Sequence, residues 1–226
     1  MIVGLTGYKN VGKDTAAAYL VEKHSFVRFA LGDEIYRQVA KAFSVTEDEV
    51  RSREWKTTVR PELALRNCKE QEFRQMIVSR EVPNIDGQIS AFCTEAQTCP
   101  RTGTFIVQNW ATEYRRGRYG NSYWVDLLVS KLMTQMPGTK VVITDIREEH
   151  EVEILEWFSR VYGPMPCGIA RIIRPGTAHT GHSSDNGLPQ QYIDGYITNM
   201  PDDFEGLYSQ LDNFLERKMK WMPPKT

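Results

Sequence analysis

The sequence predicts an α/β layer structure with a mainly parallel sheet. Short apolar runs typical of buried strands alternate along the chain with longer segments of helical periodicity. The two clearest runs are residues 2–6, which stop at Gly7, and residues 140–145, which end with Asp145. Because parallel strands need crossovers that are usually helical, the alternation indicates a layered α/β structure. A chain of 226 residues fits one domain, 1–226, with a small insertion.

Each element is predicted from its local pattern. Strands are expected at 2–6, 25–30, 140–145, 168–173 and 192–198, and helices at 15–23, 33–43, within 47–80, and at 104–117, 122–136, 148–160 and 202–220. Asp33 stands where it would cap the helix that runs to Phe43. Residues 82–103 combine turn-forming prolines and glycines with an alternating stretch at 88–93. This segment is predicted to be an inserted hairpin or flap.

Composition and charge narrow the classes of function. The 28 basic and 29 acidic residues leave a net charge of -1, whereas a dedicated duplex-binding domain has a clear basic excess. The four cysteines, at 68, 93, 99 and 167, include no CxxC pair, which favours reduced thiols over a zinc site. The chain begins without a basic signal-peptide region, and no apolar run approaches the roughly 20 residues of a membrane span. We therefore expect a soluble cytoplasmic protein with no membrane partner.

Residues 7–15 match the G-x-x-x-x-G-K pattern of a phosphate-binding loop, after a predicted strand and before a predicted helix. Glycines let the backbone curl so that its N–H groups point inward, and the helix N-terminus adds positive potential. Lys13 is expected to reach the β- and γ-phosphates as a mobile charge. The pattern predicts that ATP binds Gly7, Tyr8, Lys9, Asn10, Val11, Gly12, Lys13, Asp14 and Thr15. The alternative is an ordinary glycine-rich turn before a helix.

The position after the lysine departs from the standard pattern. Asp14 occupies the place where a serine or threonine usually follows, and the hydroxyl belongs to Thr15. Small-acceptor kinases of the adenylate-kinase type also depart there, with a glycine. Thr15 is therefore the candidate ligand for Mg²⁺.

Several blocks of sequence resemble one family in their order and spacing. They are Gly12-Lys-Asp-Thr15, Phe29-Ala-Leu-Gly-Asp33, Gln108-Asn-Trp-Ala-Thr-Glu113-Tyr-Arg-Arg116, Tyr123-Trp-Val125, Val142-Ile-Thr-Asp145-Ile-Arg147, Glu151, Ile173-Arg-Pro-Gly176 and His182-Ser-Ser-Asp185. On these blocks the chain resembles the phage-type deoxynucleoside monophosphate kinases, in the wider group with adenylate kinase and dephospho-CoA kinase. The resemblance implies a three-layer α/β/α P-loop NTPase fold, ATP as phosphoryl donor, Mg²⁺ as cofactor and nucleotide substrates. It is compatible with a homodimer and, for a phage gene, with the host cytoplasm.

The resemblance also assigns roles to residues. It implies that the deoxynucleotide pocket is lined by Thr112, Glu113, Arg116 and Trp124 and closed by Asp145, Arg147 and Glu151. It implies an acceptor-binding region at 33–103, with Lys56 and Arg66 toward the acceptor phosphate, and a lid at 175–189 beside Arg174, which would touch ATP. An arginine forks onto a phosphate, a tryptophan offers a face to a base, and carboxylates read amines or hydroxyls. Ala111 stands where the family usually has glycine.

These roles have structural alternatives. Trp124 also fits the core of an amphipathic helix, and Arg116 fits a solvated basic face. Most basic residues of 51–80 fit a solvated face, and His179 and His182 fit a loop surface. Asp145 ends a buried strand at the edge where open sheets bind ligands, and it is also a candidate to hold Mg²⁺ through water.

Three hypotheses of function follow from the sequence. The first is transfer of the γ-phosphoryl of ATP to the 5′-phosphate of a deoxynucleoside monophosphate, with Lys13, Arg116 and Asp145 as catalytic residues. The second is a kinase with a hydroxyl acceptor, either a small metabolite or a hydroxymethylated base in DNA, with Asp33 as general base. DNA is a partner only in that case. The third is a regulatory module that binds the nucleotide without transfer.

Overall fold

The computed structural model of the protein describes residues 1–81, 89–135, 138–163, 165–177 and 188–220. The chain divides into two compact units, residues 1–31 with 125–226 (unit 1) and residues 32–124 (unit 2). Unit 1 is built around a parallel sheet, and unit 2 is mainly helical.

A five-stranded parallel sheet forms the centre of unit 1. Its strands are β1 (Ile2–Thr6), β2 (Phe26–Phe29), β5 (Lys140–Ile143), β6 (Cys167–Ile173) and β7 (Gly195–Thr198). They lie in the order β2-β5-β1-β6-β7, and every neighbouring pair is parallel. All five carboxyl ends therefore point to the same edge of the sheet, as the predicted α/β fold requires.

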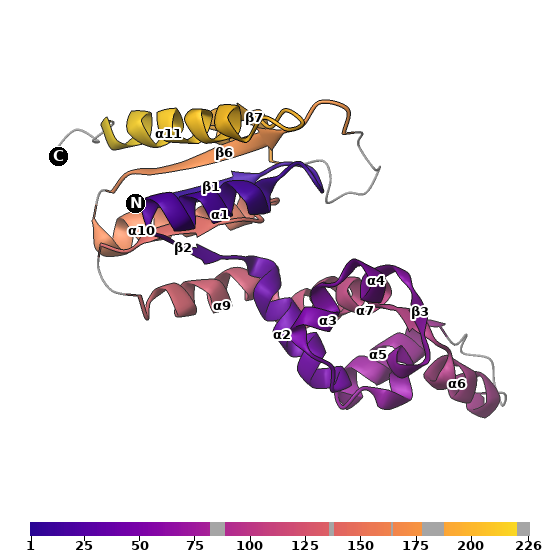
Figure 1. The fold of residues 1–226 in the computed structure, drawn as a ribbon. Coiled ribbons are helices and arrows are strands. Elements are labelled where there is room, and N and C mark those ends of the chain that lie inside the picture. Colours follow the sequence, from indigo (N-terminus) through magenta and orange to yellow (C-terminus); the bar gives the residue numbers. More distant parts are fainter. Residues whose placement is uncertain (82–88, 136–137, 164, 178–187, 221–226) are drawn as a thin grey trace. The chain divides into compact units, whose positions relative to one another are not determined.

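Helices cover both faces of this sheet, which completes the predicted three layers (Figure 1). The covering helices are α1 (Lys13–His24), α10 (Glu149–Tyr162) and α11 (Phe204–Lys220). Val3 and Leu5 of β1 join one buried cluster with Leu20 of α1 and Leu211 of α11. α10 packs on the other face and buries Phe158 there. Within the described part of the chain, no helix has the length and apolarity needed to cross a membrane.

The order of the strands creates a switch point beside β1. The chain crosses from β1 to β2 and returns to β5 on one side of β1, whereas β6 and β7 lie on its other side. Open α/β sheets bind ligands outside the carboxyl ends of their strands at such a reversal. The loop at residues 7–12 leaves β1 at this edge, so the fold places it where a ligand is expected.

Unit 2 is built from short helices around an aromatic core. α2 (Leu31–Phe43) starts at its boundary and is followed by α3 (Glu47–Arg51), α4 (Arg53–Thr57), α5 (Gln71–Glu81), α6 (Ile89–Thr98) and α7 (Gly103–Gln108). Two short strands, β3 (Val59–Arg60) and β4 (Arg101–Thr102), pair antiparallel. Trp55, Phe73 and Trp110 are at most 2 % exposed, and the rings of Phe73 and Trp110 lie 4.9 Å apart.

A π-helical segment follows α7 without a break. Residues 109–116 adopt this wider helix, and Gly117 donates its N–H to the carbonyl of Thr112, five residues earlier. α8 (Gly117–Tyr119) continues the helix, and α9 (Tyr123–Leu132) comes next. The helices predicted at 104–117 and 122–136 are thus confirmed in kind, with a change of pitch that the sequence did not reveal. Such segments are rare and are frequent at functional sites.

Three sequence predictions are wrong in detail. Residues 89–98, expected in a hairpin or flap, form α6, because a short apolar alternation also fits helical spacing. The preceding part of that predicted hairpin, 82–88, lies outside the described residues. Asp33 is the third residue of α2 instead of its cap, since the helix already begins at Leu31. Tyr192, expected in the last strand, belongs to a 3₁₀ turn before β7.

Gly103 at the start of α7 packs against the buried ring of Trp55, and a methyl group there would come within 2.0 Å of that ring. We expect Gly103→Ala to lower the free energy of unfolding by about 1–3 kcal/mol, because the indole must move. Gly117→Ala is the matched control, because its methyl group would approach nothing closer than the Thr112 carbonyl oxygen at 3.8 Å. It should leave stability unchanged or raise it by up to about 1 kcal/mol. Denaturant unfolding measures both, and equal stability of the two variants would contradict this packing.

Candidate nucleotide-binding site

The loop between β1 and α1 turns sharply at three residues. Gly7, Asn10 and Gly12 have φ angles of 135°, 64° and 99°. Glycine adopts positive φ without steric cost, and asparagine is one of the few other residues that do so readily. Positive φ angles at these points let the backbone curl, and a curled loop can turn several N–H groups toward one concave side that binds anions. α1 begins directly after Gly12, so the N–H groups of its first turn lie next to that concavity.

The two glycines let this loop lie against the ends of the neighbouring strands. A methyl group on Gly7 would come within 2.4 Å of the carbonyl oxygen of Ile172 in β6. A methyl group on Gly12 would come within 2.2 Å of Nδ2 of Asn199, which follows β7. Val11, between them, is fully buried in the core of the sheet. The inner side of the loop is therefore anchored, while residues 8–10 are exposed.

The ammonium group of Lys13 lies over the loop. Its Nζ donates to the carbonyl oxygens of Gly7 at 2.8 Å and Tyr8 at 2.7 Å. The side chain thus folds back from the first turn of α1 and brings its charge to the exposed part of the loop. A cation at this point, together with the loop N–H groups, matches the charge of a polyphosphate.

Other predicted residues lie at the same edge of the sheet. Asp145 follows β5, and its Oδ1 accepts the backbone N–H of Leu31 at 2.8 Å. Arg174 follows β6 and is half-buried, and its carbonyl oxygen accepts the hydroxyl of Thr177 at 2.7 Å. Thr15 lies in the first turn of α1, where Asp14 beside it is exposed. Residues 178–187 of the predicted lid, with His179 and His182, lie outside the described residues.

The oxygen donors at this edge suit Mg²⁺ that arrives with a nucleotide. Thr15 offers a hydroxyl and Asp145 a carboxylate, which are ligands that Mg²⁺ prefers. Mg²⁺ keeps several waters and binds substrate phosphates, so one or two protein oxygens are sufficient. Among the described residues there is no group of three or more His, Cys, Asp or Glu side chains that could hold a metal ion. The donor set fits a metal shared with a bound nucleotide.

Glu151 and Arg147, expected to close the acceptor pocket, have other surroundings. Glu151 is 4 % exposed, and its carboxylate accepts the backbone N–H groups of Arg147 at 2.7 Å and Glu148 at 3.0 Å. These N–H groups precede the first full turn of α10 and have no partner within the helix. Glu151 therefore serves as a capping residue in this structure, and the side chain of Arg147 is exposed.

The remaining acceptor residues implied by the resemblance belong to unit 2. Thr112 and Glu113 are exposed on the π-helical segment, and Glu113 pairs with Arg80 at 3.0 Å. Arg116 is half-buried on the same segment. Trp124 is 2 % exposed, and its indole N–H donates to the carbonyl oxygen of Ala111 at 3.1 Å. It presents no ring face to a base in this structure, which matches its alternative interpretation as a core residue.

A polar network around Gln38 of α2 was not predicted. Its side-chain oxygen accepts from the indole N–H of Trp110 at 3.1 Å and from Nε of Arg115 at 2.9 Å. Its side-chain nitrogen donates to Glu34 at 3.1 Å and to the hydroxyl of Tyr123 at 3.2 Å. The first two partners are 72 and 77 positions away in sequence, so no local pattern signals the network. It ties α2 to the π-helical segment that carries Arg116.

Tyr36 of α2 holds two cations near one another. The guanidinium carbon of Arg51 lies 4.9 Å from the centre of its ring, and Nζ of Lys56 lies 4.7 Å from it. Such contacts hold cations over an aromatic face. Arg51 also pairs with Asp33 at 2.9 Å. Arg51 is thus a cationic neighbour of Lys56 that was not predicted as a site residue. Arg66, the other predicted basic residue, is exposed on a separate 3₁₀ turn.

Burial suppresses ionisation of two groups in unit 2. Removal from water raises the pKa of the Tyr114 phenol, which remains neutral and donates to Glu72 at 3.1 Å. Removal from water also raises the pKa of the Cys68 thiol to about 11. Since the thiolate is the reactive form, Cys68 is a poor nucleophile at neutral pH. Cys99 and Cys167 are likewise free of disulfides.

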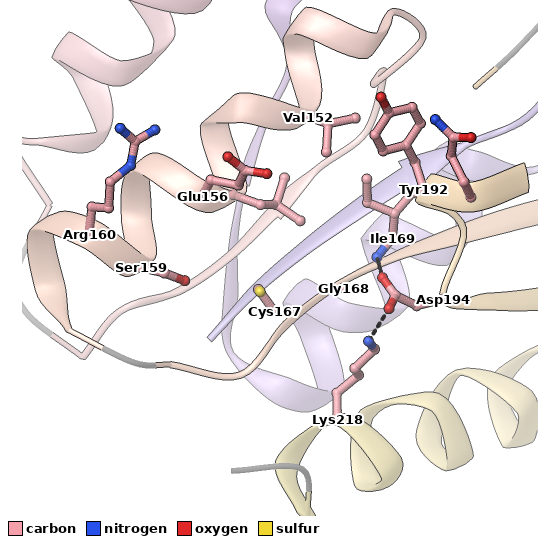
Figure 2. Close-up of a pocket in the computed structure, with 12 residues that line it drawn as sticks. Val152, Glu156, Ser159, Arg160, Cys167, Gly168, Ile169, Tyr192, Asp194 and Lys218 are labelled. Atoms are coloured by element: carbon pink, nitrogen blue, oxygen red, sulfur yellow. Dashed lines mark hydrogen bonds and ion pairs between the residues drawn. The ribbon is translucent and has the colours of Figure 1, made fainter. Parts of the chain in front are cut away.

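One cavity lies away from the phosphate loop. It has a volume of about 760 Å³, and Figure 2 shows Cys167, Asp194 and Lys218 along one side of it and Glu156 of α10 on another. Cys167 opens β6 and Asp194 precedes β7, so this cavity lies at the amino ends of the strands. Parallel sheets bind ligands at their carboxyl ends. The candidate site is therefore the loop at residues 7–15 and not this cavity.

A likeness to a viral protein covers most of the chain. A protein of Acanthamoeba polyphaga mimivirus named "Putative deoxynucleotide monophosphate kinase" is 22 % identical to it over 180 residues. The matched region is 79 % of this chain and 76 % of that protein. No protein-family model matches the chain.

Gly12 has no room for a side chain, because its φ of 99° is strained for other residues and Asn199 closes the space. We expect Gly12→Ala to weaken MgATP binding at least about tenfold, since the loop must move to admit a methyl group. Gly163→Ala is the control, because Gly163 has φ 83° but no atom within 4 Å of the added carbon. It should lose stability and keep its MgATP affinity. Titration calorimetry checks both variants, and equal affinities would contradict the tight fit at Gly12.

Proposed function

We propose that this chain is a kinase that transfers the γ-phosphoryl group of ATP to the 5′-phosphate of a deoxynucleoside monophosphate and forms the diphosphate. The observation that carries the proposal is the loop at residues 7–15, with its two constrained glycines and the Lys13 ammonium folded over it. Its N–H groups and the start of α1 supply the donors that a triphosphate needs. The name of the mimivirus relative supports a nucleotide kinase.

The proposed step needs positioning and charge more than proton transfer. An oxygen of the acceptor phosphate attacks the γ-phosphorus, and the bond from that phosphorus to the β–γ bridging oxygen breaks. ADP leaves with the bridging oxygen, and the acceptor gains the phosphoryl group. Because the attacking oxygen is already anionic, no general base is required, and catalysis comes from alignment and charge neutralisation. Lys13 neutralises charge on the leaving side. Mg²⁺ would be held by Thr15 and, through water, by Asp145, and would supply further positive charge.

The acceptor is proposed to bind residues of unit 2. Lys56 and Arg51 share the ring of Tyr36, which brings two cations to one patch. Arg116 is on the π-helical segment that Gln38 and Arg115 brace. Arginine binds phosphate through two parallel hydrogen bonds, and lysine binds it as a point charge. Thr112, Glu113 and Arg66 remain candidates for further contacts with the acceptor.

The second candidate function is a kinase with a hydroxyl acceptor. It relies on Asp33, which would remove the proton from the attacking hydroxyl. The carboxylate of Asp33 is engaged by Arg51 at 2.9 Å. That ion pair gives Asp33 a structural function, and the monophosphate acceptor is therefore favoured.

Lys13→Met tests the donor side. The purified protein is incubated with γ-labelled MgATP and a panel of deoxynucleoside monophosphates, ribonucleoside monophosphates and hydroxymethylated DNA. We expect label in a deoxynucleoside diphosphate. For Lys13→Met we expect kcat/KM to fall by a factor of about 10²–10³, because the cation that would face the transferred phosphoryl group is removed. Lys23→Met removes an exposed charge from the same helix and should behave as wild type. Transfer only to a hydroxyl would contradict the proposed acceptor, and ATP binding without transfer to any acceptor would favour a regulatory module.

Asp33→Asn separates the two acceptor classes. With a monophosphate acceptor we expect kcat to fall less than about tenfold, because the variant loses an ion pair but no general base. With a hydroxyl acceptor, loss of the base would reduce kcat by about 10²–10⁴. Steady-state rates with both acceptors measure this, and exposed Asp48→Asn serves as the charge-matched control. A large loss confined to a hydroxyl acceptor would reject the monophosphate proposal.

A further inference from the structure

Asn199 lies beneath the phosphate loop at the carboxyl end of β7. Its side chain is buried, with 4 % of the residue exposed. Its Nδ2 donates to the carbonyl oxygen of Val11 at 2.8 Å, across 188 positions of sequence. Its backbone N–H donates to the carbonyl oxygen of Ile173 at 2.7 Å, which continues the pairing of β7 with β6. Asn199 thus joins the loop to the sheet through one side-chain hydrogen bond.

This bond sets the direction of one peptide group in the loop. The carbonyl of Val11 and the N–H of Gly12 belong to the same peptide, and in a trans peptide these two groups point in opposite directions. The carbonyl oxygen points inward to Asn199. The N–H of Gly12 therefore points away from Asn199, toward the concave side that would bind phosphate. A rotated peptide would turn an oxygen lone pair to the anion instead of a donor.

The conformation of Gly12 makes this contact unusually close. Its missing side chain leaves the space that Nδ2 of Asn199 occupies, since a Cβ there would lie 2.2 Å from that nitrogen. Val11 is fully buried, so its carbonyl oxygen would have to find a new partner away from water if Asn199 were lost. An unsatisfied buried carbonyl is costly, and the loop would relieve that cost by rotating the peptide.

The position of Asn199 is itself held rigidly by α11. The side chain of Gln210 accepts the backbone N–H of Thr198 at 2.8 Å and donates to its carbonyl oxygen at 3.0 Å. It also donates to the carbonyl oxygen of Gly206 at 2.9 Å. The residue before Asn199 is thus fixed on both backbone groups, and a donor on a rigid support keeps its hydrogen bond short and directed.

We infer that Asn199 is a positioning residue for the phosphate loop and that its hydrogen bond to Val11 orients the N–H of Gly12 toward the β- and γ-phosphates of ATP. The inference rests on the proposed function in that it takes the loop to bind a nucleoside triphosphate. In the proposed arrangement, Asn199 does not touch the nucleotide. It acts through the peptide between Val11 and Gly12.

The test compares Asn199→Ala and Asn199→Asp with Ile197→Val. Asn199→Asp keeps the shape of the side chain but replaces the N–H donor with an oxygen. Ile197 is buried in β7 and lies outside the loop, and Ile197→Val should lower stability by an amount similar to the loss of a hydrogen bond. Dissociation constants for MgATP and MgADP are measured by calorimetry, melting temperatures by circular dichroism, and KM values for both substrates by steady-state kinetics.

We expect both Asn199 variants to bind MgATP at least about tenfold more weakly, which corresponds to about 1.4 kcal/mol. The KM for the acceptor should remain as in wild type, and Ile197→Val should keep its MgATP affinity at a comparable melting temperature. If Asn199→Asp binds MgATP as wild type does, packing rather than donation is the function of Asn199 and the inference is overturned. A wild-type protein that binds no MgATP would instead refute the proposed function.

A measurement on the unaltered protein covers the case in which the variants fail to fold. In ¹⁵N-labelled wild type, the side-chain amide protons of Asn199 should exchange slowly, and the Gly12 amide resonance should shift on addition of MgADP. Rapid exchange of the Asn199 amide, or a Gly12 resonance that does not respond, would overturn the inference while leaving nucleotide binding itself intact.

Discussion

The close approach of the phosphate loop to the ends of β6 and β7 is the constraint on which the candidate site depends. Gly7 lies against the carbonyl of Ile172, and Gly12 lies against the side chain of Asn199, with no space for a Cβ at either position. Those contacts are possible only because β1 is the central strand and has β6 beside it. A loop held against the sheet in this way keeps its backbone in place without a ligand to organise it. Preorganised donors of this kind stabilise charge without a cost of reorientation during the reaction.

Charge is distributed differently in the two units. In unit 1 the positive potential of the candidate site comes from backbone N–H groups, the start of α1 and the ammonium of Lys13. In unit 2 it comes from side chains that are braced by aromatic rings and carboxylates, such as Lys56 and Arg51 on Tyr36. Backbone donors fit a triphosphate chain closely, whereas long basic side chains adapt to an acceptor. Under the proposed function, this division would separate a backbone-based loop for the donor from a side-chain surface for the acceptor.

The π-helical segment carries several of the residues that are proposed to bind the acceptor. The extra residue per turn changes the direction of the side chains that follow it, and Arg115 and Arg116 end the segment. Gln38 receives hydrogen bonds from Trp110 and Arg115, so the wide turn is tied to α2 instead of being left to fluctuate. A functional side chain placed on such a braced segment holds its direction better than one on a free loop.

The sequence by itself determined the sheet, its order of helices and strands, and the phosphate loop, because each of these rests on local signals. Apolar runs define β1 and β5, helical periodicity defines α10, and the glycine spacing at 7 and 12 with Lys13 defines the loop. The sequence misassigned 89–98, where a short apolar run fits two periods, and it placed Asp33 at a cap although α2 begins two residues earlier. Only the tertiary structure decided that Trp124 is core, that Gln38 bonds to the π-helical segment, and that Asn199 bonds to the loop before α1. These facts depend on partners far apart in the chain, such as Asn199 and Val11, and such pairs exist only once the sheet and helices bring them together.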